Sequence, residues 1–179
     1  VADEAEADII VVNTCCFIRD ALEESIETIL EMAKYKIEGK CKGLIVAGCL
    51  GQRYEAEFFN EIPEVDAILG TAAYEEIADA ADRILNGEHA FKCLEDINQP
   101  MKDDNGKLRV LSTAPYFAYL KISEGCDNHC TYCVIPQMRG RNRSRTMDSL
   151  VEEAELLAGQ GVKELVIVAQ DTSIYGRDL

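Results

Sequence analysis

Residues 9–13 read IIVVN, an uninterrupted apolar run that stops at a polar residue. Such a run is typical of a strand that is buried on both faces of a parallel sheet. The segment that follows, residues 19–39, reads RDALEESIETILEMAKYKIEG and carries apolar residues at helical spacing. Its glutamates crowd the first half and its lysines lie near the end, which matches the helix dipole. We therefore predict an amphipathic helix that stops at Gly39.

The same strand and helix pattern then repeats along the chain. Strands are predicted at residues 43–47 (GLIVA) and 65–69 (VDAIL), and helices at residues 52–60 and 74–85. Strands that alternate with helices indicate an α/β fold, with a parallel sheet covered by helices. Ligands of such sheets gather at the carboxyl ends of the strands.

Periodicity is lost over residues 88–113, which we interpret as a linker with a short hairpin around Asn105-Gly106. Beyond it, the alternation resumes with a strand, a cysteine-containing loop, a helix and a second strand, predicted at residues 116–123, 126–133, 148–160 and 164–170. The prediction is therefore an α/β domain at residues 1–87, the linker, and the first β/α units of an incomplete barrel at residues 114–179.

Composition narrows the class of protein. The chain has 179 residues, a formal charge of -15 and eight cysteines. The negative charge argues against broad electrostatic affinity for nucleic acid. No apolar run is long enough to span a membrane, and no signal peptide is visible. Cysteines at the ends of apolar runs favour metal ligation in a reducing cytoplasm over a disulfide framework.

The two ends of the chain suggest a fragment. It starts at Val1 inside an acidic run and ends just after a turn-like YGRDL. One and a half β/α repeats cannot close a barrel. We therefore expect that both ends of the natural protein, including the first strand of the sheet, are missing.

Residues 126–133 read CDNHCTYC and place three cysteines, Cys126, Cys130 and Cys133, within one loop. A structural zinc site would need a second pair of ligands, and none follows; His129 is poorly placed to join the same tetrahedron. A ferredoxin-like cluster would need a fourth cysteine. Three cysteines on an iron-sulfur cluster leave one iron open, and an open position is a feature of reactive metal sites.

The CxxxCxxC spacing after a strand resembles the radical S-adenosylmethionine superfamily, whose open iron is chelated by the amino and carboxylate groups of that cofactor. The resemblance implies that Tyr132 lies near the adenine. It also implies that Arg139 and Arg145 border the cofactor and substrate pocket; a solvated loop is the alternative for this arginine-rich segment. Gln170 and Asp171 end the second barrel strand, where residues face the active site, and are expected to contact the cofactor. Glu124 and Gly125 are expected to shape the turn before the first cysteine.

Longer matches resemble the methylthiotransferase family. They are YLKISEGCDNHCTYCVIPQMRGRNRSR at residues 119–145, NTC at 13–15, AGCLGQRY at 47–54 and QDTSIYGRDL at 170–179. Within the family they are similar to the RimO type. This resemblance implies radical chemistry with two 4Fe-4S clusters and S-adenosylmethionine, an external electron donor, and an aspartate of small ribosomal subunit protein twelve as the substrate.

The resemblance also gives the first domain a task, since the family holds an auxiliary cluster there through three cysteines. Cys15 and Cys49 match two of these positions, and the third is expected on an upstream strand that this chain lacks. Cys16 is a possible substitute, but neighbouring side chains of a strand point to opposite faces. Cys41 and Cys93 match no motif and are predicted to be buried apolar residues.

Two alternatives stay open. One is methylthiolation of a tRNA adenosine, the activity of the MiaB type within the same family. The other is a non-catalytic iron-sulfur binding module, which is how this shortened chain is expected to behave on its own. We expect no membrane partner and no direct nucleic-acid binding by this fragment.

Overall fold

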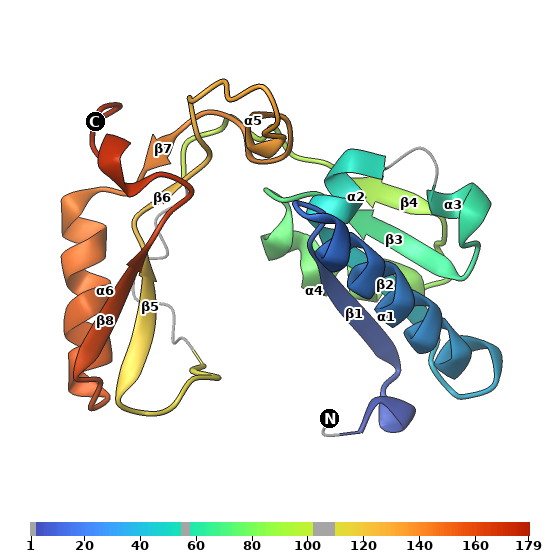
Figure 1. Ribbon diagram of the computed structural model, residues 1–179. Helices are drawn as coiled ribbons and strands as arrows, with labels where there is room; N and C mark the ends of the chain where they lie inside the picture. The colour runs from blue at the N-terminus through green and yellow to red at the C-terminus, as the bar shows by residue number, and fades with distance from the viewer. Residues whose placement is uncertain (1–2, 55–57, 102–109) are drawn as a thin grey trace. The chain divides into compact units, whose positions relative to one another are not determined.

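The computed structural model describes residues 3–54, 58–101 and 110–179. The chain divides into two compact units, Val1–Ile97 and Asn98–Leu179 (Figure 1). The boundary falls inside the segment that was predicted as a linker. No helix in the described ranges is both long and apolar enough to cross a membrane.

The first unit contains a parallel sheet of four strands in the order β1-β2-β3-β4. The strands are β1 (Ile9–Thr14), β2 (Gly43–Gly48), β3 (Val65–Leu69) and β4 (Phe91–Cys93). The first three confirm the strands predicted from the sequence, but the expected burial on both faces is wrong for β1, in which burial alternates and Val11 is 40% exposed. β4 corrects the linker prediction, because its three residues pair with β3 although they are too few to show a period of their own. The hairpin expected around Asn105-Gly106 lies outside the described residues.

Helices cover both faces of this sheet. α1 (Arg19–Ile37) and α2 (Cys49–Tyr54) lie on one face and α4 (Ile77–Leu85) on the other (Figure 1). The remaining short elements are η1 (Glu4–Glu6), α3 (Phe58–Glu61) and η2 (Tyr74–Glu76). The single helix predicted at residues 52–60 corresponds to two short helices, of which α2 begins three residues earlier than expected, directly after β2, and α3 ends at Glu61.

The core of the first unit is built on β2, whose six residues are all buried. Ile45 and Ala47 pack with Leu69 of β3 and with Ala80 and Ile84 of α4. A strand buried on both faces explains why the sequence shows a continuous apolar run instead of alternation. Cys41 and Cys93 are 6% and 9% exposed, which confirms that both are buried.

Asp66 is a buried carboxylate at the amino-terminal end of β3, with a side chain that is 3% exposed. Its Oδ2 accepts from the backbone N of Leu44 at 2.9 Å and from Nζ of Lys36 at 2.6 Å. Its Oδ1 lies 2.6 Å from Nδ1 of His89. These partners satisfy the buried charge and join α1 to the sheet at the end away from Cys15 and Cys49.

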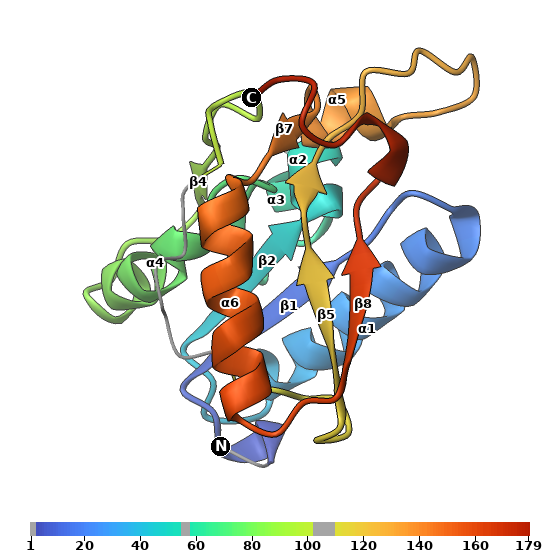
Figure 2. The same cartoon turned by 90° about the vertical axis from the view of Figure 1, so that its left-hand side faces the viewer.

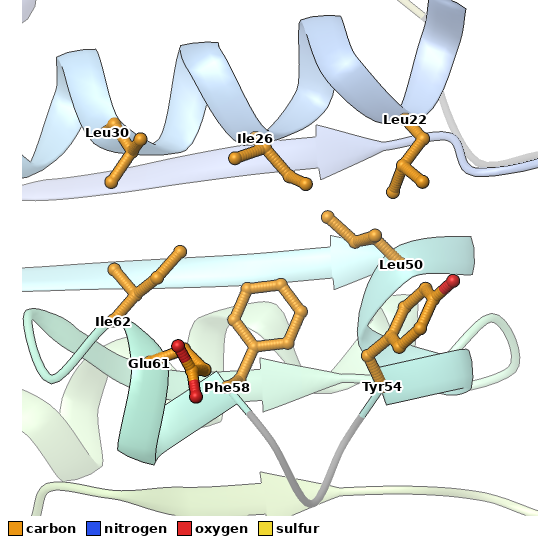
Figure 3. Close-up of a pocket in the computed structure, with 8 residues that line it drawn as sticks. All are labelled: Leu22, Ile26, Leu30, Leu50, Tyr54, Phe58, Glu61 and Ile62. Atoms are coloured by element: carbon orange, nitrogen blue, oxygen red, sulfur yellow. The ribbon is translucent and has the colours of Figure 1, made fainter. Parts of the chain in front are cut away.

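An apolar groove of about 460 Å³ lies between α1 and the α2 to α3 region. Figure 3 shows its lining residues facing one another across this space: Leu22, Ile26, Leu30, Leu50, Tyr54, Phe58, Glu61 and Ile62. Glu61 is the one charged residue among them, and none of the predicted site residues is included. The groove therefore lacks the converging polar groups that chemistry would need.

The second unit is a β/α/β unit with additions. β5 (Phe117–Lys121) pairs in parallel with β8 (Glu164–Val168), and α6 (Met147–Gly159) connects them. Figure 2 shows α6 running beside β5. Ala118, Leu157 and Val162 form the core between them. The structure confirms the predicted strands and helix with shifts of one or two residues at their ends.

Four short elements surround this unit: β6 (Ser123–Glu124), α5 (Ile135–Arg139), β7 (Arg143–Ser144) and η3 (Thr172–Ile174). β6 and β7 pair antiparallel, with Glu124 opposite Arg143. This pair closes the base of the cysteine-containing loop. Sequence analysis did not predict α5 or β7, because each is too short to show periodicity.

Candidate functional site

The ends of β1 and β2 bring two predicted ligands to the same edge of the sheet. Thr14 is paired with Gly48, so Cys15 and Cys49 follow at neighbouring strand ends. Gly48 has a φ of 98°, and a Cβ there would lie 2.7 Å from the carbonyl oxygen of Thr14. Only glycine tolerates this close turn, which lets α2 begin directly at Cys49.

Two hydroxyl side chains hold the backbone around these cysteines. Thr14 Oγ1 donates to the Ala47 carbonyl at 2.7 Å and accepts from the Leu50 N–H at 3.2 Å. Ser25 Oγ, from α1, accepts from the Cys15 N–H at 3.1 Å and donates to the Cys15 carbonyl at 2.9 Å. The threonine of the NTC motif and the serine of ESI therefore position the segment that carries Cys15.

Cys15 and Cys16, which follow β1, differ in their burial. Cys15 is exposed, whereas Cys16 is 2% and Cys49 5% exposed. Burial raises the pKa of the Cys16 thiol, and nearby Cys49 acts in the same direction while Arg53 opposes it. The assignment of Cys15 and Cys49 as ligands stays a prediction.

The cysteine loop begins at a turn that also requires glycine. Gly125 has a φ of 81°, and a Cβ there would overlap the backbone carbonyl oxygen of Arg141. The next residue, Cys126, donates its N–H to the Gly140 carbonyl at 3.1 Å and is 7% exposed. The expectation that Gly125 shapes this turn is confirmed.

The second half of the loop is open to solvent. Cys130 is exposed, Cys133 is half-buried and Tyr132 is 84% exposed. The Cys133 N–H donates to the Cys130 carbonyl at 3.0 Å, which makes a turn between these two cysteines. The structure thus gathers the three cysteines on one loop. Within the described residues, however, no three His, Cys, Asp or Glu side chains lie close enough to hold a metal ion.

The donor chemistry nevertheless fits the group that the resemblance implies. All eight cysteines lie in the described ranges and none forms a disulfide. Three thiols on one loop, two of them reachable from solvent, provide the sulfur ligands that an iron-sulfur cluster takes. The roles of Cys126, Cys130 and Cys133 as ligands stay predictions.

Glu124 is a buried carboxylate, 6% exposed, directly before this loop. It accepts from Nε2 of Gln170 at 2.7 Å and from Nη1 of Arg139 at 3.2 Å, and it also pairs with Lys121. Gln170 in turn accepts the Gly125 N–H at 2.9 Å through Oε1. Burial alone would raise the pKa of Glu124, but the charges of Lys121 and Arg139 outweigh it and hold the pKa below its usual range.

Arg145 lies inside the second unit and is 7% exposed. Its guanidinium forms an ion pair with Glu153. It also donates to Ser149 Oγ at 2.8 Å and to the Lys121 carbonyl at 3.2 Å. The Tyr175 hydroxyl donates to the Arg145 carbonyl at 3.0 Å. The solvated-loop interpretation is therefore wrong for Arg145, because α6 supplies the carboxylate that compensates its burial. That Arg139 and Arg145 border a cofactor pocket stays a prediction.

Asp171 follows β8, and each of its carboxylate oxygens has its own partners. Oδ1 accepts from the N–H of Ser173 at 2.9 Å and from its hydroxyl at 2.7 Å, while Oδ2 accepts from Nδ2 of Asn128 at 2.6 Å. The hydrogen bonds from Ser173 hold the pKa of Asp171 below its usual range; burial opposes them, and the hydrogen bond from Asn128 adds to the lowering. Contacts of Gln170, Asp171 and Tyr132 with a cofactor stay predictions.

Sequence reasoning missed several polar residues that shape this loop. Asp127 Oδ1 accepts the Asn142 N–H at 3.1 Å. Asp178 accepts the Ser144 N–H at 2.7 Å and from Nδ2 of Asn142 at 3.1 Å. These partners lie 15 to 36 residues apart in the chain, so no local spacing could reveal them.

Two family models match the chain. Residues 1–70 match the uncharacterized protein family UPF0004, and residues 120–179 match the radical SAM superfamily. The second match contains the cysteine loop, β8 and the residues that follow it. Members of this superfamily use an iron-sulfur cluster and S-adenosylmethionine, which agrees with the donor set of the loop.

Individual proteins are similar over nearly the whole chain. Proteins named ribosomal protein uS12 methylthiotransferase RimO from Lachnoclostridium phytofermentans and Pelotomaculum thermopropionicum are 56% and 55% identical to it, over 99% of the chain in each case. The protein of the same name from Clostridioides difficile is 51% identical over the full chain. The chain spans about 40% of the length of these curated relatives. Nearly the whole chain is therefore similar to proteins named as RimO-type methylthiotransferases, and its residues 120–179 match the radical SAM superfamily.

Proposed function

We propose that the protein to which these residues belong methylthiolates an aspartate side chain of ribosomal protein uS12. The observation that carries this proposal is the similarity of 99% of the chain, at 56% identity, to a protein named for that activity. The cysteine loop at the carboxyl end of a β/α/β unit supports it, because active sites of barrel-like folds lie at this end.

In this proposal, Cys126, Cys130 and Cys133 would hold one 4Fe-4S cluster, at which S-adenosylmethionine would bind. When bound, the cluster and S-adenosylmethionine supply the one-electron chemistry that removes a hydrogen atom from an unactivated carbon, with electrons from an external donor. Cys15 and Cys49 supply two ligands of an auxiliary cluster, and a residue outside this chain supplies a third. The protein then provides orientation and shielding, as is general for enzymes that rely on cofactors.

The described residues perform the orienting part. Gly125 and the Cys126 N–H fix where the first cysteine leaves the turn. Thr14 and Ser25 do the same for Cys15 at the end of β1. Both cysteine sets therefore start from backbone that is held by hydrogen bonds before any cluster forms, which lowers the cost of ordering the ligands.

The first test uses this chain alone. After anaerobic reconstitution with iron and sulfide, we expect a cluster whose electron paramagnetic resonance spectrum changes when S-adenosylmethionine is added. The Cys130→Ala variant should lose that change, whereas Cys41→Ala, at a buried cysteine away from both predicted sites, should keep it. A spectrum indifferent to S-adenosylmethionine would favour a non-catalytic iron-sulfur module.

The second test uses the complete protein. Incubated with reductant, S-adenosylmethionine and uS12, it should add the mass of a methylthio group to one aspartate of uS12. In a parallel reaction, tRNA replaces uS12 and its nucleosides are separated and weighed. A methylthio group on tRNA adenosine with uS12 unmodified would overturn the choice of substrate.

A further inference from the structure

Two consecutive residues at the carboxyl end of β8 hold the cysteine loop on both sides of Cys126. Gln170 Oε1 accepts the N–H of Gly125, the residue before Cys126, at 2.9 Å. Asp171 Oδ2 accepts from Nδ2 of Asn128, two residues after Cys126, at 2.6 Å. The loop is thus attached to the strand end at two points that enclose the first cysteine.

We infer that the hydrogen bond between Asn128 and Asp171 positions the stretch from Cys126 to Cys130 for cluster binding, and that Asp171 acts as a positioning residue. The inference rests on the proposed function, since it assumes that the loop holds a cluster. The inference goes beyond the proposed function, because it names residues that are not metal ligands and gives Asp171 a partner other than the cofactor.

The acceptor is set in place before Asn128 reaches it. Oδ1 of Asp171 caps η3 by accepting both the N–H and the hydroxyl of Ser173, so the orientation of the carboxylate is already determined. Oδ2 is then left to face the loop. An acceptor that is already oriented costs less entropy when the loop docks.

The neighbouring residue, Asp127, holds the same stretch to a different segment, because its Oδ1 accepts the N–H of Asn142 next to β7. Consecutive side chains therefore tie the loop to two separate parts of the second unit. Beyond Asn128, the turn from Cys130 to Cys133 is exposed and is closed by one backbone hydrogen bond. The Asn128 to Asp171 bond is thus the last side-chain attachment before the exposed turn among the contacts described for residues 126–133.

The chemistry of the pair allows a sharp test. Asn128→Asp would set two carboxylates against each other and remove the hydrogen bond. Asp171→Asn can be tolerated, because the Asn128 amide can turn and accept from the new amide. The double variant Asn128→Asp/Asp171→Asn restores one donor and one acceptor in reversed order, and an asparagine still caps η3.

The experiment is carried out on the full chain in a Cys15→Ala/Cys49→Ala background, so that iron reports on the loop alone. Iron and sulfide are counted after anaerobic reconstitution, and the rate of iron loss to a chelator is measured. We expect Asn128→Asp to lose iron about tenfold faster, in line with the effect of residues that orient metal ligands. The double variant should return to within about twofold of the parent rate.

Ser173→Ala is the matched control, because it removes one hydrogen bond to Oδ1 of Asp171 and leaves the Oδ2 to Asn128 contact in place. Its rate of iron loss should stay within about twofold of the parent rate, because the Ser173 N–H still orients Oδ1 of Asp171. Thermal unfolding of the iron-free chains is recorded in parallel. A purely structural contact would instead lower the melting temperature and leave the relative rates of iron loss unchanged at a temperature well below it.

The outcomes separate the two proposals. If the parent chain binds no iron at the loop, the cluster assignment within the proposed function is wrong, and the inference falls with it. If the parent binds iron but Asn128→Asp loses it at the parent rate, or the reversed pair does not rescue, the inference alone is overturned.

Discussion

Glu124→Gln is the substitution that most directly tests the network behind the cysteine loop. The glutamine keeps an oxygen that can accept from Nε2 of Gln170, but it removes the negative charge that faces Lys121 and Arg139. Glu124 is 6% exposed, so water cannot replace the lost interactions there. The variant therefore isolates the electrostatic part of the network.

The magnitude follows from the partners. Each hydrogen bond to a charged group contributes about 1.5–3 kcal/mol. The Lys121 side chain is 45% exposed and recovers much of its share from water, whereas that of Arg139 is 20% exposed and recovers less. We expect Glu124→Gln to lower the free energy of unfolding of the second unit by about 2–3 kcal/mol, which for a unit of this size is roughly 10–20 °C in melting temperature.

The effect should depend on pH in one direction. The pKa of Glu124 in the folded chain lies below its ordinary value of 4.5. A lowered folded-state pKa contributes stability that is present above the unfolded-state pKa and lost as the pH falls through the folded-state pKa. The stability difference between the parent and Glu124→Gln should therefore be full at neutral pH and shrink in acid.

The assay combines calorimetric unfolding with hydrogen exchange of the peptide that contains Gly125, whose N–H depends on Gln170. Glu152→Gln is the control, an exposed glutamate on α6 in the same unit; it should change stability by less than about 0.5 kcal/mol. Equal stabilities of the two variants at neutral pH would refute the electrostatic account. So would a difference that persists in acid.

Two further predictions concern the backbone beside the cysteines. Gly125→Ala should destabilise the second unit by about 3 kcal/mol, because a positive φ and a backbone overlap act together. In the control Gly159→Ala, the added Cβ meets no atom within 4 Å, so thermal unfolding should show a neutral or stabilising effect. Similar melting temperatures of the two variants would contradict this prediction. Ser25→Ala should lower the free energy of unfolding of the first unit by about 1–3 kcal/mol, because the Cys15 N–H and carbonyl lose their partner. Hydrogen exchange of the Cys15 amide should accelerate in this variant. The control Thr28→Ala, on the exposed side of α1, should leave that exchange unchanged.

Most of the fold could be predicted because each element carries its own periodicity. β1, β2, β3 and α1 are long enough to show buried runs or helical spacing, and the structure confirms them. β4 and β7 could not be predicted, since two or three residues have no period and become strands only through their neighbours. The early start of α2 at Cys49 depends on how closely Gly48 approaches Thr14, a contact between strands.

The candidate site could likewise be predicted from the sequence only in part. Cys126, Cys130 and Cys133 lie within eight residues, so their spacing alone predicts that they bind one metal centre. Arg145 was expected in a pocket or in solvent, yet it is buried against Glu153 of α6. A buried arginine is tolerable only where a carboxylate meets it, and that meeting depends on how α6 packs.

The sequence by itself determined what is local: the alternation of strands and helices, the spacing of the cysteines in the CxxxCxxC loop, and the resemblance to a family. Only the tertiary structure decided which distant residues support that loop. Glu124 meets Gln170, and Asn128 meets Asp171, across more than 40 residues of chain. Hydrogen bonds and ion pairs act over a few ångströms, so such partners have no signature in the sequence until β5 and β8 pair and bring their ends together.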